Sequence, residues 1–240
     1  MPILPGRIWL IDVARGLALL GMAAFHLVFD LQMFGFLLPG ASTQGVFYYH
    51  ARIVAGSFLF LAGAGLWLAH GGGVRWPAFW RRWIRIALAA TLVTLATRIV
   101  LPDWYIFFGI LHSIALASLL GLLFLRLPGS VNVLLGLGVI AAAWRLPPLL
   151  DWNHPGLRFL GLNTAPTFTV DFEPLIPWFG PFLIGMGLAR LAMPLLPGLA
   201  RLRPPPPWHR MDWPGRHSLA IYLLHQPVLI ALVWAMAQLR

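Results

Sequence analysis

Apolar residues in this chain form long runs, and shorter stretches richer in glycine, proline and charged residues separate them. A helix needs ~20 mostly apolar residues to cross the hydrocarbon core of a bilayer. Runs that reach or approach this length predict membrane-spanning helices at 8–31, 51–70, 82–101, 106–125, 131–146, 174–195 and 217–239. The pattern therefore predicts an all-α fold, a polytopic integral membrane helix bundle of about seven transmembrane helices.

The connections between these runs are short. The longest are 32–50, 147–173 and 197–216, and none is long enough for a second folded domain, so we expect a single transmembrane domain over 1–240. Small residues recur inside the runs, and within a membrane they let helix backbones approach each other closely. We expect such close packing at Gly63, Gly65, Gly136, Gly138, Gly185 and Gly187.

The composition excludes an ordinary soluble protein, because 60% of the 240 residues are apolar and only 10% are charged. A soluble domain carries roughly 25% charged residues. The net charge of +10 comes from 17 arginines scattered among the apolar runs, so we expect a lipid bilayer and no nucleic acid as partner. The chain has no cysteine, which excludes thiolate chemistry, and we expect no metal.

The distribution of arginine predicts the orientation, since cytoplasmic segments of membrane proteins carry an excess of basic residues. With the N-terminus in the cytoplasm, these segments include Arg75, Arg81, Arg82, Arg85, Arg190, Arg201, Arg210 and Arg216. The outer side then holds Asp103, Asp151, Asp171 and Glu173. We therefore expect the N-terminus in the cytoplasm and the C-terminus outside. The many Arg, Ala, Gly and Pro residues without lysine suggest a GC-rich bacterial genome, and hence the bacterial inner membrane.

The first span contains the strongest candidate for acid–base chemistry. His26 and Asp30 are four residues apart, so their side chains share one helix face near the outer end of the span. An aspartate that accepts a hydrogen bond from one imidazole nitrogen leaves the other nitrogen free to act as a base. We take both as candidate catalytic residues. The alternative is a polar contact between helices that only stabilises the bundle.

Further candidates lie on the same predicted side of the membrane. His112 is in the outer half of the fourth span, where it could line one cavity with His26. Asp171, Glu173 and Trp178 stand at the start of the sixth span, and we take them as candidates for binding a substrate. The simpler interpretation is that the two acids form a solvated helix N-terminus and that Trp178 is an interfacial belt residue.

Other polar residues belong to the last span and to the cytoplasmic end of the first. His225 and Gln226 directly precede Pro227, which removes a helical hydrogen-bond donor, so they are candidates for binding in a kinked, polar segment. The alternative is a polar contact between helices. Asp12 and Arg15 are three residues apart and can form an ion pair near the cytoplasmic end.

The first outer loop supplies two more candidates. His50 ends this loop, where we expect it to be exposed, and Arg52 follows two residues later. Arg52 could pair with Asp30, or with Asp171 or Glu173 near the sixth span.

Several motifs together resemble the heparan-α-glucosaminide N-acetyltransferase catalytic-domain family. They are IDVARGLA at 11–18, with Met22, Phe25, His26 and Asp30 beyond it, FLFLAG at 58–63, FGILHSIA at 108–115, and DFEPLIPWFG at 171–180. The ending GRHSL at 215–219 with YLLHQP at 222–227 is similar to wider transmembrane acyltransferase groups. The resemblance covers nearly the whole chain.

The resemblance implies an enzyme, an acetyl-CoA-dependent transmembrane acyltransferase. Such an enzyme would move an acetyl group from acetyl-CoA, the acyl donor on the cytoplasmic side, to a sugar or glycan acceptor at the outer side. The implied partners are acyl-CoA and a carbohydrate acceptor, and a homodimer stays open. The chain lacks the long lumenal insertions that would bind heparan sulfate.

The chain also departs from the family pattern at its histidines. The eukaryotic members have an asparagine where this chain has His26, and their catalytic histidine lies in the first lumenal loop. Its nearest counterpart here is His50.

These observations combine into one hypothesis with two alternatives. In the hypothesis, His26 is the base, Asp30 orients it, His112 or Arg52 stabilises the developing charge, and Arg15 holds the phosphates of the donor. One alternative is a protein that binds haem or quinone through His26, His112 and His225. The other alternative is a transporter with a polar pathway.

Overall fold

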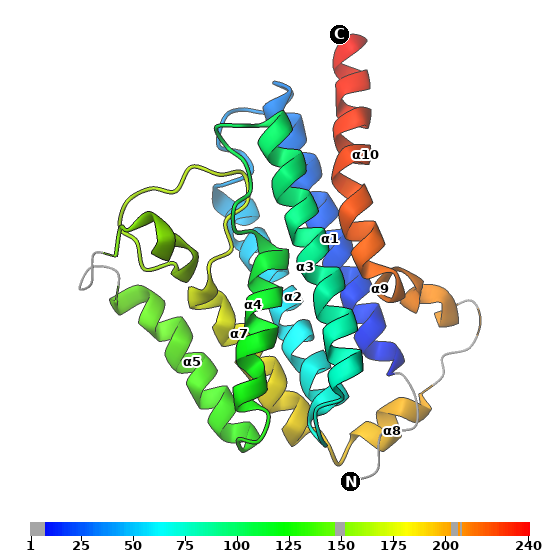
Figure 1. Cartoon of the computed structure of the whole chain (residues 1–240). Coiled ribbons are helices and arrows are strands. Elements are labelled where there is room, and N and C mark those ends of the chain that lie inside the picture. Colours follow the sequence, from blue (N-terminus) through cyan, green and yellow to red (C-terminus); the bar gives the residue numbers. More distant parts are fainter. Residues whose placement is uncertain (1–7, 147–151, 203–205, 207) are drawn as a thin grey trace. The chain divides into compact units, whose positions relative to one another are not determined.

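The computed structural model describes residues 8–146, 152–202, 206 and 208–240 (Figure 1). Asp151 lies outside the described residues. The longer helices are α1 (Trp9–Met33), α2 (Gly45–His70), α3 (Trp76–Val100), α4 (Ile110–Gly121), α5 (Gly129–Arg145), α7 (Leu175–Leu191) and α10 (Ser218–Gln238). Short helical turns are η1 (Leu122–Phe124), η2 (Pro155–Leu160), α8 (Leu196–Arg201), η3 (Trp208–Asp212) and α9 (Trp213–Arg216). Within the described residues the β-structure is a single bridge between Phe108 and Phe172, so the all-α prediction is confirmed.

Each of the seven predicted spans coincides with one of the longer helices. By length and composition, α1, α2, α3 and α10 are long and apolar enough to cross a membrane. The helices α4 with η1, α5 and α7 are apolar but shorter. The count of seven transmembrane helices and the orientation of the N-terminus stay predictions.

Two helices begin six residues before the sequence-based boundaries. Helix α2 begins at Gly45, six residues before the predicted start, so His50 is inside a helix rather than at the end of a loop. Helix α3 begins at Trp76, where Pro77 occupies the first turn. Proline suits that position because the first amides of a helix have no partner within the helix. Polar residues directly before the predicted starts, His50 and Arg81, made the apolar runs look shorter than the helices are.

The chain divides into two compact units, with the boundary inside α2. Among the described residues, one unit comprises those within 8–57 and 197–240, and the other comprises those within 58–196. Each unit is described by itself below. The single domain over 1–240 stays a prediction.

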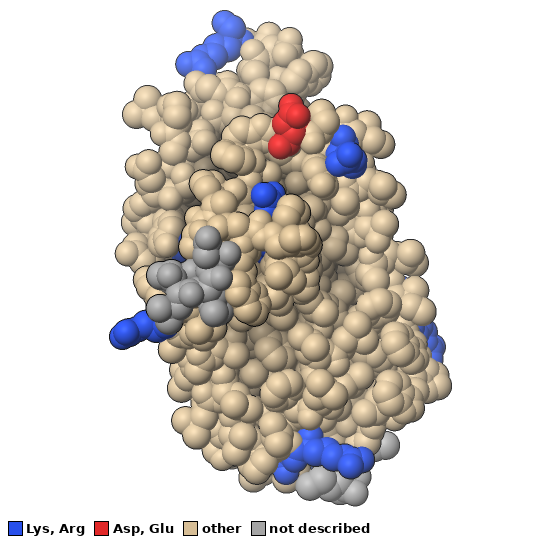
Figure 2. Space-filling view, turned by 60° about the vertical axis from the view of Figure 1, so that its left-hand side comes forward, with Lys and Arg blue, Asp and Glu red and all other residues tan. Residues whose placement is uncertain are grey.

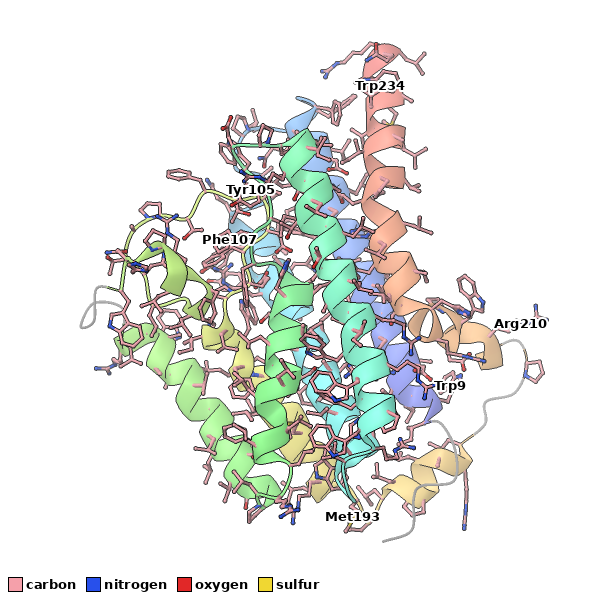
Figure 3. The ribbon with its side chains drawn as sticks, in the orientation of Figure 1. Trp9, Tyr105, Phe107, Met193, Arg210 and Trp234 are labelled. Atoms are coloured by element: carbon pink, nitrogen blue, oxygen red, sulfur yellow. The ribbon has the colours of Figure 1, made fainter. Side chains whose placement is uncertain are left out.

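In the unit formed by the two ends of the chain, α1 and α10 lie side by side and run in the same direction (Figure 1). Gly215, before α10, packs on the backbone of Asp12, and at the other end Arg240 donates to the carbonyl of Gly35. Figure 3 shows the same order, with Trp9 at the start of α1 and Trp234 toward the far end of α10. The loop after α1 is closed by Gln32, whose side-chain oxygen accepts from the amide and the hydroxyl of Ser42.

In the other unit, glycines bring α5 and α7 into backbone contact. A Cβ atom on Gly136 would lie 2.6 Å from the carbonyl oxygen of Gly180, and one on Gly187 would lie 2.5 Å from that of Gly129. Gly63 and Gly185 make equally close contacts between α2 and α7. The predicted close packing is therefore confirmed at these positions, whereas Gly138 faces open space.

The outer surface of the helices is apolar. On α10 the exposed residues include Leu224, Val228 and Leu232. Figure 2 shows a face on which few charged side chains interrupt a broad surface of other residues. Such a surface suits contact with lipid acyl chains. The four long apolar helices, together with the family relationship, indicate a membrane protein.

Candidate functional site

Four polar side chains meet between the largely apolar helices α1 and α10. His26 and Asp30 come from α1, and His225 and Gln226 come from α10. His26 Nδ1 lies 2.9 Å from His225 Nε2, and Gln226 Nε2 donates to Asp30 Oδ1 over 2.8 Å. We call these four residues the α1–α10 polar cluster. Asp30 is fully buried, and the other three are partly buried.

The pairing inside the cluster corrects the prediction that Asp30 orients His26. His26 pairs with His225, and Asp30 pairs with Gln226. The other oxygen of Asp30, Oδ2, is buried without a hydrogen-bond partner. Residues four apart on a helix are neighbours, but α10 places an imidazole and an amide against them at hydrogen-bonding distance.

The hydrogen bonds determine which histidine nitrogen is free. His225 Nδ1 contacts the carbonyl oxygen of Tyr222, which only accepts, so Nδ1 carries a proton. In neutral His225 the Nε2 atom is then an acceptor, and His26 Nδ1–H donates to it. Neutral His26 is thereby left with an unprotonated Nε2, while its ring also has a hydrogen bond with the backbone of Met22 on the same helix. This atom is the candidate base of the cluster.

A second histidine of the same unit has one free nitrogen. His50 on α2 is half-buried, and its Nε2 lies 2.8 Å from the carbonyl oxygen of Gly21 on α1. A carbonyl accepts, so Nε2 carries the proton and Nδ1 is the acceptor. The exposure expected for His50 is therefore wrong.

Arg52 lies two residues further along α2 and is exposed. Its guanidinium group stacks on the ring of Tyr48, 3.6 Å from the ring centroid. A stacked guanidinium gains from the negative face of the ring. Arg52 is thus held by its own helix, whereas the carboxylate of Asp30 binds Gln226.

The start of α1 holds the predicted ion pair. Arg15 Nη1 donates to Asp12 Oδ1 over 2.9 Å, and Asp12 is buried. Helix α9 packs against this turn, and its last residue, Arg216, forms a longer ion pair of 3.8 Å with Asp212. Arg15 and Arg216 therefore place two guanidinium groups at this end of the unit.

In the other unit, His112 is tied into the start of α4. Its Nδ1 accepts from the amide of Gly109, so in neutral His112 the Nε2 atom carries the proton and donates to Thr94 Oγ1 over 3.1 Å. Thr94 in turn donates to the carbonyl of Ile106. Both ring nitrogens are occupied. A cavity shared by His112 and His26 stays a prediction, since the two residues belong to different units.

Asp171 also binds the start of α4, and not the start of α7, the helix that follows it in sequence. Its Oδ2 accepts from the amide of Ile110, the first residue of α4, over 3.3 Å. Burial raises the pKa of Asp171 from 3.8 to about 6, although the bond from Ile110 acts in the opposite direction. The segment is held in place by backbone bonds, such as the one from the amide of Glu173 to the carbonyl of Phe108. Figure 3 labels Phe107 in the segment that leads into α4.

The structure locates the remaining candidates, Glu173 and Trp178, but does not assign them a role in the polar cluster. Glu173 and Trp178 are partly buried at the start of α7. The residues that the sequence did not single out are Tyr222 and Thr94. The contribution of Tyr222 is a backbone carbonyl, which every residue has, and Thr94 is one of three threonines in α3, so neither stood out in the sequence. Among the described residues, no group of three His, Asp or Glu side chains is arranged to hold a metal ion.

Comparison with known proteins identifies the family to which the chain is similar. The family model described as "Heparan-alpha-glucosaminide N-acetyltransferase, catalytic" matches residues 7–227. No curated protein and no solved structure is similar enough to match this chain.

Proposed function

The chain belongs to the heparan-α-glucosaminide N-acetyltransferase catalytic family, and from this premise we propose that it transfers an acetyl group from acetyl-CoA to a sugar or glycan acceptor. The family supports a membrane acyltransferase. The observation that carries the finer proposal is the free Nε2 atom of His26, held in place through His225. We place the acceptor at the outer side of a bacterial inner membrane and the donor at the cytoplasmic side.

In the proposed reaction His26 is the general base. Its Nε2 takes the proton from an O–H or N–H group of the acceptor as that oxygen or nitrogen attacks the thioester carbonyl of acetyl-CoA. His26 is then an imidazolium, and its Nδ1–H bond to His225 Nε2 stabilises the positive charge. The tetrahedral intermediate expels the thiolate of CoA, which takes the proton from His26 Nε2. The products are acetylated acceptor and free CoA thiol.

Arg15 and Arg216 support a donor site at the cytoplasmic end of α1. Guanidinium groups bind phosphates through several parallel hydrogen bonds, and CoA carries its phosphates at one end of a long pantetheine arm. Arg15 and His26 are separated by about 16 Å along the helix, at 1.5 Å per residue. An extended pantetheine arm could bridge that separation, with the thioester at His26 and the phosphates near Arg15.

The parallel course of α1 and α10 supports an odd number of membrane crossings. If α1, α2 and α3 cross in turn, α3 ends on the side opposite to the start of α1. Helix α10 runs in the same direction as α1, so it starts on the side where α1 starts. One or all three of α4, α5 and α7 must therefore cross between α3 and α10, which fits the prediction of seven.

The haem alternative has no support in the cluster. His26 Nδ1 and His225 Nε2 face each other at 2.9 Å, which is too close for an iron ion between them at ordinary Fe–N distances of ~2 Å. Both nitrogens of His112 are bound within its own unit. No contact in the described part of the chain favours the transporter over the enzyme.

The proposal is tested with the purified chain in nanodiscs, radiolabelled acetyl-CoA, and a panel of free sugars and amino sugars. We expect acetylation of at least one acceptor, and a loss of at least about 100-fold in kcat/KM for His26→Ala, as for other general bases. His225→Ala should lower kcat without abolishing activity, because it only orients His26. His50→Ala is the matched histidine control, and it should retain activity.

Two outcomes would contradict the proposal. The first is a wild-type chain that acetylates no acceptor and does not bind CoA. The second is full activity in His26→Ala with a large loss in His50→Ala, which would move the base to His50.

A further inference from the structure

Two buried oxygen atoms of the α1–α10 polar cluster have no hydrogen-bond partner. They are Asp30 Oδ2 and Gln226 Oε1. Asp30 is fully buried, and buried polar atoms are almost always paired in native proteins. An unpaired buried acceptor has lost its hydration without a replacement, and the loss is larger when the acceptor is charged. A pair of them on facing side chains therefore indicates that something outside the described chain completes the pairing.

The hydrogen bond between Gln226 and Asp30 determines whether the two unpaired oxygen atoms need donors or acceptors. An ionised carboxylate can only accept, so the amide nitrogen of Gln226 must face Asp30 Oδ1, and Gln226 Oε1 is an acceptor. Both open positions therefore require donors. The nearby imidazoles do not supply them, because His225 Nδ1–H is bound to Tyr222 and His26 Nδ1–H is bound to His225.

Two adjacent hydroxyl groups meet this requirement. Each hydroxyl has one hydrogen to donate, so a vicinal diol can satisfy one oxygen of Asp30 and one oxygen of Gln226 at the same time. A water molecule, with two hydrogens, can occupy the same position when no diol is bound. The acetyl group and the thioester have no donors. The amide and hydroxyl donors of acetyl-CoA are in the pantetheine arm, which the proposed function places between Arg15 and His26, whereas Asp30 lies one helical turn beyond His26.

We infer that Asp30 and Gln226 form the subsite that recognises a vicinal diol of the acceptor, one helical turn from the base His26. This inference rests on the proposed function and names its acceptor class, a polyhydroxylated sugar with a free diol. Residues four apart on a helix lie ~5–6 Å apart, so the diol and the reacting group are different groups of one acceptor molecule. Asp30 and Gln226 hold the acceptor, and His26 removes its proton.

The experiment compares glucosamine with its 3-deoxy and 4-deoxy analogues, each of which lacks one hydroxyl of the diol. Wild type and Asp30→Asn are assayed in nanodiscs with radiolabelled acetyl-CoA. An asparagine oxygen still accepts from Gln226, so the helix pairing is kept, while an amide nitrogen takes the place of the open oxygen. Asp103→Asn, an acid-to-amide change at an exposed position, is the matched control.

We expect Asp30→Asn to raise KM for glucosamine at least about 10-fold and to change kcat less than about 3-fold. For the deoxy analogue that lacks the bound hydroxyl, wild type and Asp30→Asn should have the same high KM, since the contact is already absent. An equal rise in KM for all three acceptors, or a fall in kcat alone, would overturn the inference.

Equilibrium binding of tritiated glucosamine without acetyl-CoA separates this inference from the proposed function. Binding by wild type that is lost in Asp30→Asn, without any transfer, supports the diol subsite and contradicts the acyltransferase. Transfer to glucosamine with an unchanged KM in Asp30→Asn supports the acyltransferase and contradicts the subsite. Absence of both binding and transfer contradicts both. Competition by methylammonium but not by ethylene glycol would identify an ammonium site and overturn the inference.

Discussion

At the scale of single residues, the same residue type has different roles that its hydrogen bonds reveal. His112 uses both ring nitrogens to hold the start of α4, whereas His26 keeps one nitrogen free. From the sequence the two residues looked alike, because each is a histidine in an apolar run. Only a residue with an unoccupied nitrogen can take a proton from a substrate, so the structure favours His26 over His112 as the base.

Asp171 gives a residue-scale prediction about pH. Because burial raises its pKa from 3.8 to about 6, folded Asp171 keeps a proton that the unfolded chain releases as the pH rises through that interval. Stability should therefore fall as the pH rises from about 4 to about 6. Thermal unfolding of the nanodisc-bound chain should show this fall, and Asp171→Asn should remove it. Asp103→Asn is the control at an exposed acid. The same slope in Asp171→Asn as in wild type would contradict the assignment.

At the scale of helices, their positions could be predicted more readily than their packing. Apolar runs located all seven longer helices because a bilayer demands ~20 apolar residues in sequence, a requirement that is local. Small residues indicated where helices could touch, but not which ones do. Gly136 and Gly138 are both on α5, yet only Gly136 meets α7, because residues two apart on a helix point in different directions.

The pair Gly136 and Gly138 makes the packing testable. Alanine in place of either glycine favours the helix by up to ~1 kcal/mol. At Gly136 the added Cβ would lie 2.6 Å from the carbonyl of Gly180, so Gly136→Ala should be destabilising overall, by about 1–3 kcal/mol. Gly138→Ala should be neutral or stabilising, since nothing lies within 4 Å of its Cβ. Thermal unfolding in detergent checks the difference, and equal Tm values for the two variants would contradict the α5–α7 contact.

At the scale of the whole molecule, the two ends of the chain belong to one compact unit. This unit contains the complete α1–α10 polar cluster, with partners 196 and 199 residues apart in sequence. No local pattern links residues at such a separation. The parallel course of the first and last long helices also bears on the proposed topology, because two parallel helices that both cross the membrane imply an odd number of crossings.

The absence of cysteine makes the topology directly measurable by single-cysteine labelling. With the N-terminus inside and an odd number of crossings, Thr43→Cys and Arg240→Cys should react with a membrane-impermeant maleimide on intact spheroplasts. Gly72→Cys, in the turn between α2 and α3, should react only after permeabilisation. All three positions are exposed. Labelling of Thr43→Cys with protection of Arg240→Cys would indicate an even number of crossings, and the reverse pattern at all three sites would invert the orientation.

The sequence by itself determined the membrane setting, the helix positions, the Asp12–Arg15 ion pair and the family, because each depends on residues close together in the chain or on motifs read in order. It also identified all four members of the α1–α10 polar cluster as candidates. The tertiary structure alone decided how they pair: His26 with His225, and Asp30 with Gln226. Hydrogen bonding depends on distances of about 3 Å between atoms, and those distances exist only after α10 has packed against α1.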